Sequence, residues 1–245
     1  MKKILIGLLC LTASVGFGAL AYGKQVGGNS RVAKPRPTVS VGWLKKNLKD
    51  DNLVLLHIGR KSEYDEGHIP GAQHFLNRAI STTREESKLR LQIPELAKLK
   101  ENFEKVGVSN SSRIILYFGK DWVTPTTRIY FTLDYLGLRE NTSILDGGMP
   151  AWVAKGETLT DKVQPPKKGN LVVEKGNGKL VASAEWVEAN RKDPTVDIID
   201  ARTPNHFTGA TAARYPRPGH IPGAKNIPYS SIVDEKLKLI DKAKL

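Results

Sequence analysis

Residues 67–72 read Gly-His-Ile-Pro-Gly-Ala, and the same six residues recur at 219–224. Two identical hexapeptides in corresponding places indicate a duplicated structural unit. Pro followed by Gly predicts a tight turn, because Pro fixes the entry and Gly tolerates a backbone conformation that other residues resist. We expect His68 and His220 to be structural residues that hydrogen-bond across this turn. The hexapeptide therefore predicts two copies of one fold in a single chain.

The repeat extends to the N-terminal side of each hexapeptide. Aligning Trp43 with Trp186 also pairs identical residues around them: Ser40 with Ser183, Asn47 with Asn190, Lys49 with Lys192 and Asp50 with Asp193. A strand expected at 53–58 then falls on 196–201, and an insertion around 208–217 explains the longer spacing to the second hexapeptide. Chance is a poor explanation for this agreement.

In the first copy, strand-like and helix-like segments alternate. Three short segments are expected to be strands, at 53–58, 113–118 and 142–145, and the first of them is a short apolar run typical of a buried parallel strand. Four segments have helix-start signals or an apolar stripe with helical spacing, at 40–48, 94–106, 126–136 and 150–155. The alternation predicts the α/β class, in which each domain has a central parallel sheet flanked by helices.

The N-terminus has the three features of a secretory signal peptide. Met1-Lys2-Lys3 is positively charged, residues 4–17 are almost wholly apolar, and Ala19-Leu20-Ala21 places small residues before a cleavage site. The apolar stretch is shorter than the roughly 20 residues of a membrane span. We expect export, periplasmic or secreted, with no stable membrane anchor after cleavage. An uncleaved anchor is the alternative.

These features divide the chain into five parts. They are a signal peptide at 1–21, a flexible tether at 22–37, a first domain at 38–160, a linker at 161–179 and the start of a second domain at 180–245. The first copy continues from Ala72 to Gly156, whereas far fewer residues follow Ala224. We therefore expect the second domain to be incomplete and the sequence to be truncated at its C-terminal end.

Charge and cysteine content restrict the function. The formal net charge is +13, which suits anionic substrates, but the basic residues are scattered among acids and do not predict nucleic-acid binding. Cys10 is the only cysteine and lies in the predicted signal peptide. The rest of the chain therefore has no disulfide, no thiolate metal site and no Cys nucleophile. No metal cluster or nucleotide-binding loop is recognisable, so we expect no cofactor.

Four segments, 63–72, 145–152, 200–202 and 219–224, resemble the tandem two-domain rhodanese family of sulfurtransferases. The resemblance implies two rhodanese-like domains and the transfer of a sulfane sulfur through a Cys persulfide. The expected partners are a small anionic donor, thiosulfate or 3-mercaptopyruvate, and a thiophilic acceptor.

In this family the thiolate begins a loop between a central strand and a helix. That position falls at Phe118 in the first domain, so this domain is expected to lack catalysis. The same spacing in the second domain places the nucleophile near position 270, beyond Leu245 (about 46 residues after Ala224). The 245-residue chain is therefore predicted to be inactive.

Three residues of the second domain are candidates for binding the donor. Asp200 is expected at a strand end, where open α/β sheets bind ligands, and Arg202 follows it. His206 falls where the family has an additional substrate Arg, which leaves the donor preference open. The alternative for Asp200 and Arg202 is a pair that braces the strand end. In the first domain, His57 and Gly59 occupy the corresponding positions.

Two function classes remain on these grounds. The leading hypothesis is an exported thiosulfate or 3-mercaptopyruvate sulfurtransferase. The alternative is a non-catalytic rhodanese-like module that binds an anion or a protein.

Overall fold

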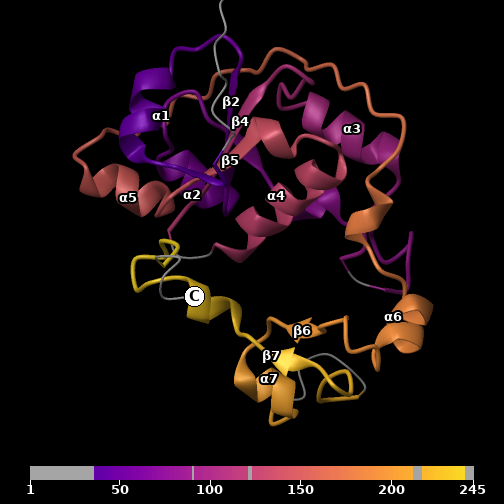
Figure 1. Cartoon of the computed structure of the whole chain (residues 1–245). Coiled ribbons are helices and arrows are strands. Elements are labelled where there is room, and N and C mark those ends of the chain that lie inside the picture. Colours follow the sequence, from indigo (N-terminus) through magenta and orange to yellow (C-terminus); the bar gives the residue numbers. More distant parts are fainter. Residues whose placement is uncertain (1–35, 90, 121–122, 212–216, 241–245) are drawn as a thin grey trace, which may run out of the picture. The chain divides into compact units, whose positions relative to one another are not determined.

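A computed structural model describes residues 36–89, 91–120, 123–211 and 217–240 (Figure 1). The predicted signal peptide at 1–21 and residues 22–35 of the predicted tether lie outside this part. Within it, none of the helices has both the length and the apolar character needed to cross a bilayer.

The first domain is built on a five-stranded parallel sheet with the strand order β1-β5-β4-β2-β3 (Figure 1). The strands are β1 (Thr38–Val39), β2 (Leu53–Ile58), β3 (Gln73–Phe75), β4 (Arg113–Phe118) and β5 (Thr142–Leu145). The structure confirms the three strands predicted at 53–58, 113–118 and 142–145. Central strand β4 is buried from Ile114 to Phe118, as expected for a parallel strand covered on both faces.

Helices cover both faces of this sheet. They are α1 (Val41–Asn47), α2 (Lys61–Glu66), α3 (Leu96–Glu104), α4 (Thr124–Tyr135) and α5 (Gly148–Ala154), with short 3-10 helices η1 (Asn77–Ile80) and η2 (Arg139–Asn141). Ile114 and Leu116 share one core cluster with residues of α3 and α4. Ile115 and Tyr117 share the other with residues of α1, α2 and α5. Alternate side chains of one strand therefore reach opposite faces.

Three of the predicted helices have other bounds in the structure, and the one expected at 150–155 spans Gly148–Ala154. The helix expected at 94–106 spans Leu96–Glu104, because the chain is still extended at Glu95 (φ −53°, ψ 144°). The helix expected at 126–136 begins at Thr124, with Pro125 in its first turn. Pro lacks a backbone N–H and fits this position without loss.

The second domain repeats the local structure of the first. It contains α6 (Ala184–Asn190), β6 (Ile199–Asp200), α7 (Pro204–Thr208), β7 (Lys225–Asn226) and the 3-10 helices η3 (Gly178–Leu180) and η4 (Tyr229–Ile232). The Trp186 N–H donates to Ser183 Oγ at 3.1 Å, as the Trp43 N–H donates to Ser40 Oγ at 3.2 Å. The strand expected at 196–201 is shorter, since β6 comprises two residues, which pair in parallel with β7.

The segment between the domains, expected as a linker at 161–179, is fixed to the first domain. Leu171 is 1% exposed and belongs to the core cluster that contains α3 and α4. Its N–H donates to Glu104 Oε1 at 2.8 Å. The neighbouring Val172 exchanges two hydrogen bonds with the Asn110 side chain, although the Val172 side chain is 68% exposed. The core of the first domain therefore includes Leu171, which lies beyond the domain boundary expected at residue 160.

Replacing Leu171 by Ala is expected to lower the free energy of unfolding by about 2–5 kcal/mol, because a buried side chain is lost and a cavity remains. The matched substitution Val172→Ala should change it by less than about 0.5 kcal/mol. Both can be measured by urea denaturation followed by circular dichroism. Equal effects of the two substitutions would show that the segment is not part of the core.

Candidate functional site

The two hexapeptides form the same turn. Gly71 has φ +81° and Gly223 φ +90°, a region that favours glycine. The Ala72 N–H donates to Ile69 O at 3.0 Å, and the corresponding bond in the second copy is 2.9 Å long. This confirms the tight turn that the sequence predicts.

Each hexapeptide histidine fixes its turn to the preceding helix. His68 Nδ1 donates to Tyr64 O at 2.7 Å, and the two rings stack with centroids 3.8 Å apart. His220 Nδ1 donates to Phe207 O at 2.7 Å, with stacked ring centroids 3.6 Å apart. The two histidines thus have equivalent structural roles.

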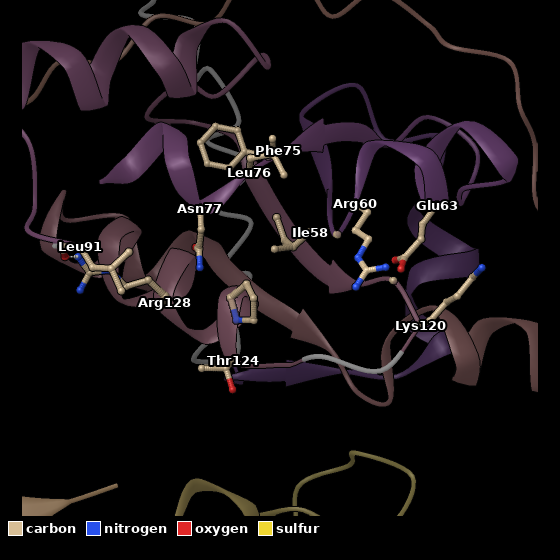
Figure 2. Close-up of a pocket in the computed structure, with 13 residues that line it drawn as sticks. Ile58, Arg60, Glu63, Phe75, Leu76, Asn77, Leu91, Lys120, Thr124 and Arg128 are labelled. Carbon is tan, nitrogen blue, oxygen red and sulfur yellow. Dashed lines mark hydrogen bonds between the residues drawn. The ribbon is translucent and has the colours of Figure 1, made fainter. Parts of the chain in front are cut away.

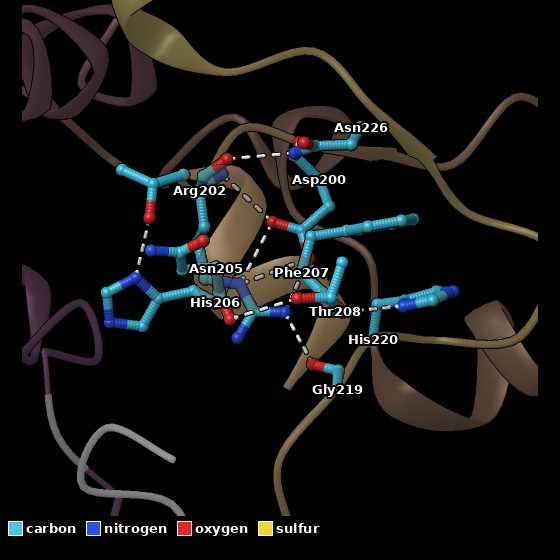
Figure 3. A network of polar contacts seen from close by, with 10 residues as sticks. Asp200, Arg202, Asn205, His206, Phe207, Thr208, Gly219, His220 and Asn226 are labelled. Carbon is cyan, nitrogen blue, oxygen red and sulfur yellow. Dashed lines mark hydrogen bonds and ion pairs between the residues drawn. The ribbon is translucent and has the colours of Figure 1, made fainter. Parts of the chain in front are cut away.

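Asp200 and Arg202 form a forked ion pair at the end of β6 (Figure 3). Arg202 Nε donates to both carboxylate oxygens at 2.9 and 3.0 Å, and Nη2 also donates to one of them. Nη2 further donates to Gly219 O at 2.7 Å. Asn226 Nδ2 donates to the backbone oxygens of Asp200 and Arg202 and ties the pair to β7. The bracing interaction considered from the sequence is therefore present.

Hydrogen bonds from Arg202 to the carboxylate lower the pKa of Asp200, against the opposing effect of burial. Asp200 is thus ionised at neutral pH. The third predicted residue, His206, lies in α7, and its Nδ1 is 2.8 Å from Thr203 Oγ1. The structure brings Asp200 and Arg202 together and joins His206 to Thr203.

An apolar ring stands at the position that the sequence predicts for the nucleophile of the first domain. Phe118 ends β4 and is 1% exposed. A Cβ placed on Gly148, which has φ +57°, would lie 2.6 Å from this ring. The ring therefore packs directly on the backbone at the start of α5, and neither residue offers a nucleophile.

A cavity of about 580 Å³ opens beside this position, at the carboxyl ends of β2 and β4 (Figure 2). Its wall is largely apolar and includes Ile58, Phe75, Leu91 and Pro125. Four charged residues also line it: Arg60, Glu63, Lys120 and Arg128. No sequence pattern had indicated this cavity. The repeat could have pointed to it. It aligns Glu63 with the predicted site residue His206, just as it aligns His57 with Asp200.

In the described part of the chain, no three His, Cys, Asp or Glu side chains are grouped so as to hold a metal ion.

Replacing Arg202 by Gln is expected to raise the pKa of Asp200 toward its ordinary value of 3.8, because the charged donors are removed. In the parent chain, the ionised carboxylate stabilises the fold above pH 3.8, and this stability is lost as the pH falls through the lower folded pKa. Carboxyl-carbon NMR titration measures the shift. Arg191→Gln, which removes the surface partner of Glu188, serves as the control. An unchanged Asp200 titration in Arg202→Gln would contradict the assignment.

Comparison with known proteins identifies the family. The rhodanese-like domain family matches residues 40–155 and 183–244. Thiosulfate/3-mercaptopyruvate sulfurtransferase 1, mitochondrial, of Arabidopsis thaliana is 28% identical over 236 residues, which cover 84% of this chain and 61% of the relative. The sulfur carrier protein TtuD of Thermus thermophilus is 30% identical over 220 residues, covering 82% and 73%.

The crystal structure of SseA from Escherichia coli, described as a 3-mercaptopyruvate sulfotransferase, superposes with a TM-score of 0.75. It is 26% identical, and the match covers 86% of this chain and 81% of SseA. The chain therefore spans only part of the length of these relatives, from 61% to 81% of each of the three. Because the family matches two separate segments that together make up most of the chain, the chain belongs to the rhodanese family of sulfurtransferases and contains two rhodanese-like domains.

Proposed function

We propose that the protein transfers a sulfane sulfur from thiosulfate or 3-mercaptopyruvate to a thiophilic acceptor. The observation that carries the proposal is the match of both domains to rhodanese sulfurtransferases along most of the chain. The Asp200–Arg202 pair, at the carboxyl end of β6, supports it further. Open α/β sheets bind ligands at this edge.

The proposed reaction has two steps. A Cys thiolate attacks the outer sulfur of thiosulfate, the S–S bond breaks, and its electron pair leaves with sulfite. The acceptor, for example cyanide, then attacks the terminal sulfur of the persulfide, which forms thiocyanate and regenerates the thiolate. A thiolate suits both steps because it is a soft, polarisable nucleophile.

Arg202 is proposed to hold the anionic donor. Its guanidinium keeps its charge at all relevant pH values and presents donors in a fixed fork. Asp200 and Gly219 O orient this fork, so bracing and donor binding are compatible roles. His206 is proposed to take part in donor choice, because it stands where the family carries an additional Arg.

The thiol of this reaction is not present in residues 11–245, because Cys10 is the only cysteine of the sequence. We propose that Cys10 belongs to a signal peptide that is removed on export to the periplasm or outside the cell. The 245-residue chain by itself is then expected to be inactive.

The test is thiocyanate formation from thiosulfate and cyanide, and pyruvate formation from 3-mercaptopyruvate. It compares the complete product of the gene with the 245-residue chain and its Cys10→Ala variant. We expect turnover and a persulfide, seen by mass spectrometry, in the complete product only. Arg202→Ala should raise its KM for thiosulfate about tenfold or more, since a charged hydrogen bond is worth about 1.5–3 kcal/mol. Arg191→Ala is the control.

Turnover by the Cys10→Ala variant of the 245-residue chain would refute the thiolate mechanism. Failure of the complete product with both donors would favour the second candidate, a non-catalytic binding module. That candidate has its own support, because the first domain has a cavity at its sheet edge but no thiol there.

A further inference from the structure

We propose that Asn226 is a positioning residue of the donor site in the second domain. Its side chain holds the main chain on both sides of Ala201 and thereby fixes the direction in which the Arg202 guanidinium projects. The inference rests on the proposed role of Arg202 in binding the sulfur donor. The hold of Asn226 on Arg202 does not itself depend on sulfur transfer and can be tested separately.

Asn226 lies where the two short strands of the second domain end. It is the last residue of β7 and is paired in parallel with Asp200, the last residue of β6. Its Nδ2 donates to Asp200 O at 2.9 Å and to Arg202 O at 2.8 Å (Figure 3). The amide nitrogen carries two N–H groups, so one side chain can hold both carbonyl groups.

This side chain carries the connection to β7 one residue further along the chain that leaves β6. A backbone bond holds the residue before Arg202, because the Tyr229 N–H donates to Ala201 O at 2.9 Å. The next carbonyl group, that of Arg202, accepts from the Asn226 side chain. Asn226 therefore acts on the residue that carries the guanidinium.

Arg202 is held through its main chain as well as through its side chain. Its N–H donates to Asp200 Oδ1 at 2.9 Å, and its carbonyl group accepts from Asn226. Its guanidinium donates to the Asp200 carboxylate and to Gly219 O. These bonds restrict rotation of the backbone and of the side chain, so the guanidinium is oriented before an anion arrives. Loss of the bond from Asn226 should therefore loosen the guanidinium, although that bond is made to the main chain.

The exposure of the ion pair indicates which of its members meets the donor. The Asp200 side chain is 12% exposed, whereas the Arg202 side chain is 36% exposed. The carboxylate is thus largely covered, and Arg202 retains surface through which an anion can approach. Because a guanidinium presents its donors in a fixed plane, a small rotation changes how well it fits an anion.

The first copy makes the same connection at a position that has no side chain to orient. The spacing between the hexapeptides relates Asn226 to His74. His74 Nε2 lies 3.0 Å from the carbonyl oxygen of Gly59, and Gly59 stands where Arg202 stands in the second copy. In both copies, a side chain of the strand after the hexapeptide thus holds the same carbonyl group. In the second copy this hold acts on a guanidinium.

The first test uses the 245-residue chain and does not require turnover. Asn226→Ala should raise the pKa of Asp200 toward its ordinary value of 3.8, because a looser Arg202 donates less well to the carboxylate. The rise should be smaller than in Arg202→Gln, which removes the guanidinium. Carboxyl-carbon NMR titration measures both. Asn190→Ala is the matched control, since Asn190 Nδ2 also donates to a backbone oxygen, that of Trp186, at 2.7 Å, and it should leave the Asp200 titration unchanged.

The second test measures sulfur transfer from thiosulfate to cyanide by the complete product of the gene. Asn226→Ala should raise the KM for thiosulfate about two- to tenfold, the range that corresponds to one neutral hydrogen bond. The kcat should change by less than about twofold, because ground-state binding is lost. Asn190→Ala should change neither. In the Arg202→Ala background, Asn226→Ala should have little further effect on KM, because a positioning residue acts through the residue that it positions.

A third variant, Asn226→His, introduces the connection that the first copy uses and decides the question if Asn226→Ala fails to fold. Its imidazole can donate to Arg202 O in the way that His74 contacts Gly59 O. We expect its KM for thiosulfate to lie between those of the parent and Arg202→Ala. The pKa of Asp200 should lie between those of the parent and Arg202→Gln.

An Asp200 titration that is the same in Asn226→Ala and in the parent would overturn the hold of Asn226 on Arg202. An equal rise in KM with and without Arg202 would show a general structural role and overturn the positioning role. A shifted titration with an unchanged KM would overturn the link to the donor. Absence of turnover in the complete product would refute the proposed function, and the donor role of Asn226 with it, while the titration would still report the hold on Arg202.

Discussion

Parallel pairing of β2 with β4 over six residues is the constraint from which the rest of the first domain follows. Leu53 is paired with Arg113 and Ile58 with Phe118, so both strands end at the same level. Because the strands are parallel, the residues that follow them emerge at one edge of the sheet. Gly59 and Gly119 are thereby adjacent, and the cavity lies where their loops separate.

The two copies keep the same turn and differ at the sheet edge. Both histidines of the hexapeptides stack on an aromatic ring of the preceding helix. At the edge, the second copy has an ionised Asp200–Arg202 pair, whereas the first has the neutral His57. The two copies therefore share the turn that closes this part of the fold and differ in the residues at the strand ends.

The sequence predicted what depends on local pattern. The run at 113–118 gave the bounds of β4 because a strand buried on both faces is apolar throughout, whereas the run at 196–201 is a strand for only two residues. The burial of Leu171 was not predicted, since a Lys-, Gly- and Pro-rich neighbourhood indicates a linker and carries no sign of distant packing. Asp200 and Arg202 were candidates from their place at a strand end and from the family resemblance, and the ion pair between them is the bracing alternative that the sequence left open. The cavity beside Gly59 and Gly119 was not predicted, because its lining comes from loops that meet only in the folded domain.

The sheet edges of the two domains also differ in charge and packing, which affects how well each could stabilise an anion. A persulfide and its donors are anions, which require nearby cations or hydrogen bonds to remain stable. At the first edge, the predicted nucleophile position is Phe118, whose ring packs against Gly148. The nearby His57 has its pKa lowered to about 4, chiefly by burial, and stays neutral. A thiol placed at Phe118 would have its pKa raised by burial and would lack a cationic partner in His57. Its packing, as well as its lack of a thiol, therefore supports the prediction that the first domain does not transfer sulfur.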